Sequence, residues 1–269
     1  MEWFLGIILG IIEGITEWLP ISSTGHMILF NEFVKNGGFT ATDLYIYVIQ
    51  LGAILAVVTM YFKKLNPFAL SKTKQEKADT WQMWFKVIVA VLPAAVIGLL
   101  FDEYMEKIET WYVVAPMLIV YGLGFILIEN RKKQTKIHTM NDMTYKTALL
   151  IGLFQVLSII PGTSRSGATI LGAMLIGCSR GIAAEFSFFL AIPVMVGVSI
   201  LKIGKFLLAG EVLSGTDIGV LLLSMAVAYV VSLCAIKFLT DFVKKHDFKV
   251  FGWYRIILGI IVIAVFLIQ

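Results

Sequence analysis

The chain has 269 residues, of which 59% are hydrophobic and only 15% are charged, and its mean hydropathy is +0.89. This composition excludes a water-soluble globular domain and is typical of a polytopic membrane protein. The formal net charge is +4, and the basic residues are concentrated in short loops. Such loops indicate how a membrane protein is oriented in the bilayer and do not indicate a nucleic-acid-binding surface. We expect a single all-α membrane domain over residues 1–269.

The first apolar region, around residues 3–34, is interrupted in its middle by Pro, Ser, Thr and Gly. Lipid offers no hydrogen-bond partner to non-helical backbone, so this region cannot be an ordinary spanning helix. We expect a re-entrant helical hairpin whose turn is buried in protein. Glycines at positions 6, 10 and 14 form a small-residue stripe on its first helix, which favours close packing against another helix.

The turn of this region reads Glu13-Gly-Ile-Thr-Glu17-Trp-Leu-Pro-Ile-Ser22-Ser23-Thr24-Gly-His26. The two glutamates are four residues apart, which places both carboxylates on one face of a helix. Carboxylates held together at this depth suit a divalent cation, and Mg²⁺ and Ca²⁺ both prefer oxygen ligands. The serine and threonine hydroxyls precede a helix N-terminus, where an anion is favoured. The histidine is a candidate general acid or base.

Six further apolar stretches have the length that crosses a bilayer. Three follow the first broken region and three follow a second broken region around residues 147–179. The predicted crossings are Leu44–Phe62, Trp84–Phe101, Trp111–Ile128, Phe186–Leu208, Ile218–Leu239 and Trp253–Ile268.

The second broken region carries the segment Pro161-Gly-Thr-Ser164-Arg165-Ser166-Gly-Ala-Thr169. A guanidinium at bilayer depth is unfavourable unless it has a partner, so it marks a functional site by default. Its planar fork matches phosphate oxygens, and the neighbouring hydroxyls add donors. The structural alternative is a salt bridge from this arginine to Glu13 or Glu17. This region is also expected to form a re-entrant hairpin.

Basic residues are concentrated in three loops, which the positive-inside rule places in the cytoplasm. These residues are Lys63, Lys64, Lys72, Lys74 and Lys77; Arg131, Lys132, Lys133, Lys136 and Lys146; and Lys244, Lys245 and Lys249. The opposite connections, residues 102–106 and 210–217, are acidic or neutral. Both termini are therefore expected outside the cytoplasm.

The chain resembles itself at an offset of 142 residues. Gly10 aligns with Gly152, Glu13 with Gln155, Ser22 with Ser164 and Gly25 with Gly167. Each half, approximately 1–140 and 141–269, contains one broken region followed by three crossings, so the second half is inverted relative to the first. This pattern predicts six transmembrane helices and two re-entrant helical hairpins in an inverted-topology repeat.

The segments Glu13 to His26 and Pro161 to Thr169 resemble the two signature motifs of the bacterial undecaprenyl-diphosphatase family, also called the bacitracin-resistance protein family. Phe186 to Pro193 is similar to that family as well. The resemblance implies a multi-pass enzyme of the bacterial plasma membrane that hydrolyses undecaprenyl diphosphate to undecaprenyl phosphate and inorganic phosphate, and so recycles the lipid carrier of cell-wall synthesis. It also implies a divalent-cation requirement, a site reached from the outer leaflet, and bacitracin resistance, because that antibiotic competes for the substrate.

Under this interpretation Glu13 and Glu17 hold the metal, and Arg165 is the charge clamp of the site. The attacking group is Ser23 or a water, with His26 as proton carrier, or His26 is itself the nucleophile. The hydroxyl side chains expected to bind the phosphoryl oxygens are Ser22, Thr24, Ser164, Ser166 and Thr169. The alternative function is a transporter or flippase for a lipid phosphate or small anion, since an inverted repeat with re-entrant tips is also an alternating-access scaffold. The oligomeric state is left open, with a homodimer as one arrangement.

Overall fold

The computed structural model describes residues 2–34, 43–131, 135–210 and 212–268. Throughout these ranges the secondary structure is helical, with turns and one isolated bridge between Ile137 and Cys178. The expectation of an all-α membrane protein is confirmed.

The helices occur in the predicted order, a broken hairpin followed by long helices, and this order occurs twice. The first set comprises α1 (Glu2–Thr16), α2 (Ser23–Val34), α3 (Asp43–Met60), the short α4 (Phe62–Leu65), α5 (Lys74–Lys107) and α6 (Trp111–Asn130). The second set comprises α7 (Tyr145–Val156), the 3₁₀ turn η2 (Leu157–Ile159), α8 (Arg165–Ile176), α9 (Arg180–Leu208), α10 (Gly215–Phe242) and α11 (Lys249–Ile268).

Five of the described helices, α5, α6, α9, α10 and α11, are long and apolar enough to cross a membrane. The sixth predicted crossing corresponds to α3, whose apolar part, Leu44–Met60, is shorter. That length lies at the lower end of what spans a hydrocarbon core. The chain is therefore a multi-pass membrane protein.

One predicted loop is wrong. Residues 102–106 continue α5, which ends at Lys107, beyond the apolar part of the helix at Phe101. A helix satisfies its own backbone hydrogen bonds, so it can extend from lipid into water wherever the sequence contains good helix formers. The other neutral connection is also shorter than expected, because Ser214 caps α10 and Asp217 lies in its first turn. Glu211, within that connection, lies outside the described residues.

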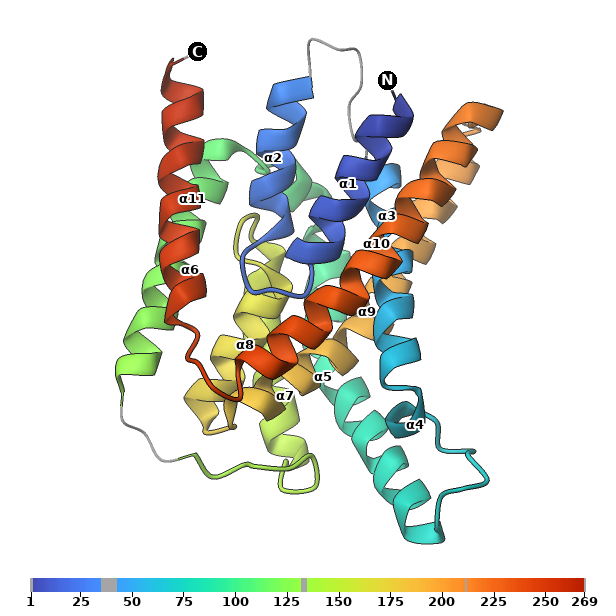
Figure 1. Ribbon diagram of the computed structural model, residues 1–269, viewed down its shortest axis with the longest axis vertical. Helices are drawn as coiled ribbons and strands as arrows, with labels where there is room; N and C mark the ends of the chain where they lie inside the picture. Colours follow the sequence, from blue (N-terminus) through green and yellow to red (C-terminus); the bar gives the residue numbers. More distant parts are fainter. Residues whose placement is uncertain (1, 35–42, 132–134, 211, 269) are drawn as a thin grey trace.

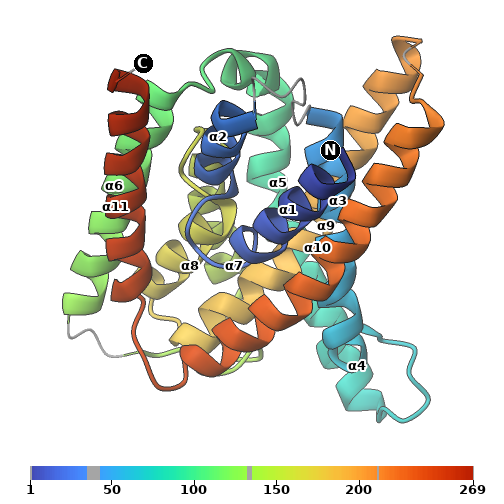
Figure 2. The same ribbon diagram turned by 45° about the horizontal axis from the view of Figure 1, so that its top comes forward.

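Both termini lie at one end of the molecule, and α4 and the connections around residues 135–144 and 243–248 lie at the other end (Figure 1). The α1–α2 hairpin starts from the end with the termini, whereas α7–α8 starts from the opposite end, and the two turns meet between them (Figures 1 and 2). The described basic residues of the three loops thus share one end, as predicted. Lys132 and Lys133 of the second loop lie outside the described residues.

Each hairpin packs against a long helix of the other half through small residues. Gly10 of α1 lies against the backbone of Ser224 in α10, and Gly6 and Gly14 contact the same helix. The predicted close packing of this glycine stripe is confirmed. In α7, Gly152 lies against the backbone of Ala90 in α5. Any side chain at these glycines would push the hairpin away from its supporting helix.

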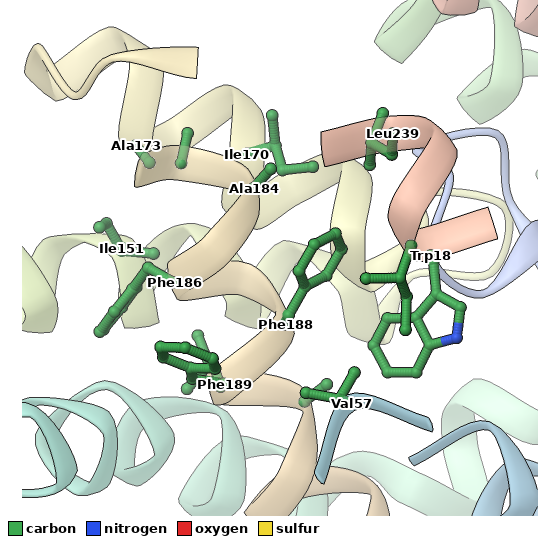
Figure 3. Packing of buried hydrophobic residues seen from close by; sticks show 14 of the residues in the cluster. Trp18, Val57, Ile151, Ile170, Ala173, Ala184, Phe186, Phe188, Phe189 and Leu239 are labelled. Carbon is green, nitrogen blue, oxygen red and sulfur yellow. The ribbon is translucent and has the colours of Figure 1, made fainter. Parts of the chain in front are cut away.

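The turn of the first hairpin is anchored in the largest apolar cluster (Figure 3). Trp18 is fully buried, and its ring meets the Phe188 ring edge-on at 5.6 Å between centroids. The Arg165 guanidinium lies over the same indole ring at 5.6 Å from its centroid, a cation–π arrangement. Packing of aromatic side chains therefore fixes the position of the polar turn that follows.

Candidate active site

The two turns share an unusual backbone feature. Ser22 and Ser164, 142 residues apart, have φ angles of +74° and +73°, and among the described residues they are the non-glycine residues with positive φ. Each side-chain oxygen accepts a backbone hydrogen bond three residues on, from Gly25 at 3.4 Å and from Gly167 at 3.2 Å. Such backbone conformations are unfavourable by about 1–3 kcal/mol and concentrate at functional sites. The strain falls where α2 and α8 begin.

The ion pair between Arg165 and Glu17 connects the two turns. Arg165 Nη2 donates to Glu17 Oε1 at 2.6 Å, and only 11% and 9% of the two side chains are exposed. Arg165 Nη1 donates to the backbone oxygen of Ser187 at 2.8 Å. The other oxygen of Glu17 lies 3.5 Å from Ser23 Oγ. The structure thus brings three predicted site residues together around one carboxylate, and it contains the salt bridge to Glu17 that was the structural alternative for Arg165.

Glu13 lies one helical turn before Glu17 and is fully buried. Within the described residues, no hydrogen bond of ordinary geometry reaches either of its carboxylate oxygens. Every other buried side-chain polar atom without a partner in this part of the chain also belongs to one of the two hairpins. These atoms are Thr16 Oγ1, Trp18 Nε1, both amide atoms of Gln155, Thr163 Oγ1 and Arg165 Nε. Buried polar groups normally have partners, so this clustering is what a site for a polar ligand requires.

The hydroxyls of the second turn bind mainly to protein. Ser166 Oγ donates to the Leu19 carbonyl at 3.3 Å and lies 3.2 Å from Ser164 Oγ. Thr169 Oγ1 lies 2.7 Å from Ser187 Oγ and donates to the Arg165 carbonyl at 2.9 Å. These contacts hold the two hairpins and α9 in register. Ser187 was not singled out from the sequence, although it lies in the segment that resembles the family.

His26 points toward α11. Its Nδ1 lies 2.7 Å from the carbonyl oxygen of Ser22, and its Nε2 lies 2.7 Å from the Tyr254 hydroxyl. Because a carbonyl can only accept, Nδ1 carries the proton in the neutral ring, and Nε2 accepts from the tyrosine. Thr24, on the first turn of α2, is partly exposed.

Arg255 is a site residue that the sequence analysis missed. It is fully buried. Its guanidinium donates to the carbonyls of Gly162 and Thr163 at 2.8 and 2.9 Å, and to the carbonyls of Pro20 and Leu118 at 3.3 and 3.4 Å. One side chain therefore ties the turns of both hairpins to α6. Because it is a lone arginine within the last predicted apolar crossing, the sequence could have identified it as a candidate site residue.

Comparison with known proteins adds an independent finding. The family model described as bacitracin resistance protein BacA matches residues 6–261. The chain is 59% identical over 265 residues to an undecaprenyl-diphosphatase of Enterococcus faecalis, covering 97% of this chain and 96% of the relative. It is 57% identical over 266 residues to one of Lactobacillus delbrueckii subsp. bulgaricus, covering 97% of each chain. A relative of the same name in Streptococcus mutans is 55% identical over 267 residues, covering 97% of this chain and 95% of the relative.

Proposed function

Since the chain belongs to the bacitracin resistance protein family, we propose that it is an undecaprenyl-diphosphatase, which hydrolyses the C55 lipid diphosphate to undecaprenyl phosphate and inorganic phosphate. The observation that carries the proposal is the meeting of Arg165 and Glu17 at 2.6 Å inside an apolar protein. Release of inorganic phosphate from a polyprenyl diphosphate by the purified protein tests it directly.

Arg165 has a donor left for the substrate. Its two terminal nitrogens hold Glu17 and the Ser187 backbone, whereas Nε has no partner among the described residues. A phosphoryl oxygen at Nε would accept a charge-assisted hydrogen bond. Charge spreads over these oxygens as the phosphoryl group is transferred, so a fixed cation stabilises the transition state. The surrounding apolar cluster strengthens that effect by excluding water.

The attacking group is Ser23 or a water at the same place. Glu17 Oε2, 3.5 Å from Ser23 Oγ, is placed to accept the proton that the attacking oxygen loses. Attack on the terminal phosphorus forms a new P–O bond and breaks the anhydride P–O bond, so undecaprenyl phosphate leaves. If Ser23 attacks, a water then releases the phosphate from the serine. Glu17 is the first proton acceptor in this scheme, and His26, whose ring nitrogens bind the Ser22 carbonyl and the Tyr254 hydroxyl, would carry a proton in a later step.

The residues present fit a divalent cation. Glu13 offers two buried oxygens that no hydrogen bond of ordinary geometry reaches among the described residues, although the Gln50 side chain interacts with this carboxylate. Glu17 lies one turn further along. Among the described residues, no three His, Cys, Asp or Glu side chains are grouped so that they could hold a metal ion by themselves. Two carboxylates with phosphate oxygens and water are an arrangement typical of Mg²⁺. When bound there, Mg²⁺ or Ca²⁺ would neutralise charge on the diphosphate.

We also propose that the protein resides in the bacterial plasma membrane with the end that carries the basic residues in the cytoplasm and both termini outside. Bacitracin, which sequesters the substrate, would compete with the enzyme for it. In a background with the native Cys178 and Cys234 replaced, single cysteines at Ser71 and at Val212, both exposed, give a direct test. A membrane-impermeant maleimide added to intact cells should label the second cysteine and not the first.

The alternative function is a flippase or transporter for a lipid phosphate. The observation that favours it is the pair of equivalent strained turns at Ser22 and Ser164. Alternating access would use these hairpins as gates. Such a protein would bind the phosphate head without releasing inorganic phosphate, so the same assay separates the two functions.

A further inference from the structure

Two apolar clusters of the first half are separated by one level of α1 and α3. The outer cluster includes Leu9 of α1 and Ile49 of α3. The largest apolar cluster lies beyond it and includes Trp18, just after α1, and Ala53 of α3. The two helices pack against each other, and both run from the end with the chain termini toward the opposite end (Figure 1). The residues between the two clusters on α1 and on α3 therefore lie at the same depth.

Three side chains with ligand oxygens occupy this level. Glu13 and Glu17 follow the outer cluster along the first hairpin, and Gln50 precedes Leu51, which packs against the largest apolar cluster. The Gln50 side chain interacts with the Glu13 carboxylate, yet no hydrogen bond of ordinary geometry reaches that carboxylate. An amide and a carboxylate that lie close without a well-formed bond between them suit a common third partner better than each other.

The second half of the chain shows that the fold does not need a polar side chain at the position of Gln50. At the repeat offset of 142 residues, Glu17 corresponds to Ile159 and Gln50 to Ile192. Ile192 packs against the largest apolar cluster. A glutamine at bilayer depth is unfavourable unless its amide has a partner. Packing alone therefore does not explain Gln50, and a ligand held by the first half does.

We propose that Gln50 is a third protein ligand of the divalent cation and binds it through its amide oxygen, beside Glu13 and Glu17. The inference rests on the proposed function, which places the cation here, and adds one ligand. Mg²⁺ takes about six oxygen ligands and Ca²⁺ about six to eight, and amide oxygens are among those they accept. Two carboxylates balance one divalent cation. A third carboxylate would repel the diphosphate, whereas a neutral amide does not.

Two substitutions of Gln50 test its oxygen. Gln50→Leu removes the oxygen and places an apolar side chain where the second half also has one, so the fold should be retained, which thermal unfolding checks. Gln50→Glu keeps an oxygen at the same position. Gln82→Leu is the matched control, because Gln82 is an exposed glutamine on α5. The probe is Mn²⁺, a cation that also takes oxygen ligands, and its electron paramagnetic resonance signal reports binding without substrate.

We expect the Mn²⁺ affinity to fall about tenfold or more in Gln50→Leu, since loss of an outer-sphere partner alone has an effect of this size. The affinity should stay at or above the wild-type value in Gln50→Glu and should not change in Gln82→Leu. If Gln50 only oriented Glu13 by donating an N–H, Gln50→Glu would also lose affinity, because a carboxylate has no donor. That loss would overturn the proposal, as would wild-type affinity in Gln50→Leu or no Mn²⁺ binding by folded wild-type protein.

A labelled carbon identifies the ligand directly. In protein made with glutamine that carries ¹³C at the side-chain carbonyl, electron–nuclear double resonance of bound Mn²⁺ should show a strong coupling to a glutamine carbon. The same signal should be absent from Gln50→Leu. A weak coupling in the wild-type protein, typical of an outer-sphere group, would contradict direct ligation by Gln50.

Phosphate release is measured on the same proteins, so that this inference and the proposed function can fail separately. A strong glutamine coupling in wild-type protein that releases no phosphate would refute the phosphatase and leave Gln50 as a ligand of a cation site. Cation-dependent phosphate release without that coupling would support the phosphatase and remove Gln50 from the metal site.

Discussion

Arg165 of the second hairpin and Glu17 of the first form a 2.6 Å ion pair, although they are 148 residues apart in the sequence. The pair joins turns that start from opposite ends of the molecule. Buried ion pairs contribute little net stability, because desolvation offsets their attraction. This pair is therefore better explained by the position it gives to two reactive groups than by stabilisation of the fold.

Removing either partner should abolish activity and also destabilise the protein. Arg165→Ala or Glu17→Ala leaves one buried charge unpaired, which lowers the free energy of unfolding by about 3 kcal/mol. The double variant should lose less stability than the sum of the single changes. Thermal unfolding in detergent measures this coupling. Additive losses would show that the two side chains do not interact in the folded protein.

Arg165→Lys should retain much of the stability but little of the activity. An ammonium group can still pair with Glu17, but it cannot also hold the Ser187 backbone and a phosphoryl oxygen in one plane. We expect kcat to fall about 100-fold, the scale seen when one transition-state donor is lost. Wild-type kcat in the lysine variant would mean that charge alone suffices at this position.

Tyr254→Phe removes the hydrogen bond to His26 Nε2 and keeps the ring stacked on the imidazole. If His26 carries a proton in the reaction, loss of this partner should lower kcat about tenfold, the order of a lost hydrogen bond. Tyr112→Phe, exposed on α6, is the control. The pH profile of kcat should change in Tyr254→Phe alone, whereas identical profiles would leave Tyr254 with a packing role.

Arg255→Met leaves carbonyls of both hairpin turns without their donor. The free energy of unfolding should fall by about 3 kcal/mol, since each unsatisfied buried acceptor costs about 1–3 kcal/mol. Arg131→Met, on an exposed arginine, should be nearly neutral. Equal unfolding temperatures for the two variants would show that Arg255 does not tie the turns together.

Glu13→Gln should weaken binding of the divalent cation, because it removes one of two carboxylates offered to it. The Mn²⁺ signal in electron paramagnetic resonance reports free ion and needs no substrate, so binding can be measured apart from activity. We expect Mn²⁺ affinity to fall about tenfold or more relative to wild type and to a Glu76→Gln control on an exposed helix end. Unchanged affinity would remove Glu13 from the proposed metal site.

The order of elements and the two hairpins could be predicted because lipid penalises broken backbone so strongly. The carboxylates and Arg165 were predictable as site residues for a related reason, since a charged side chain inside an apolar segment is unfavourable unless it has a partner or a ligand. The orientation of His26 was not predictable, because it depends on Tyr254, which is distant in the chain. Likewise Arg255 gains its role only when α11 packs beside both turns. The extension of α5 to Lys107 depends on helix propensity in water, where hydropathy gives no signal.

The most direct measurement is inorganic phosphate release from undecaprenyl diphosphate by the detergent-purified protein, with and without Mg²⁺ or Ca²⁺, beside folded Arg165→Ala and Glu17→Ala. The proposed function predicts release by the wild-type protein that depends on the cation and is lost in both variants. Binding of the lipid phosphate without any release by folded wild-type protein would contradict it and favour a lipid transporter.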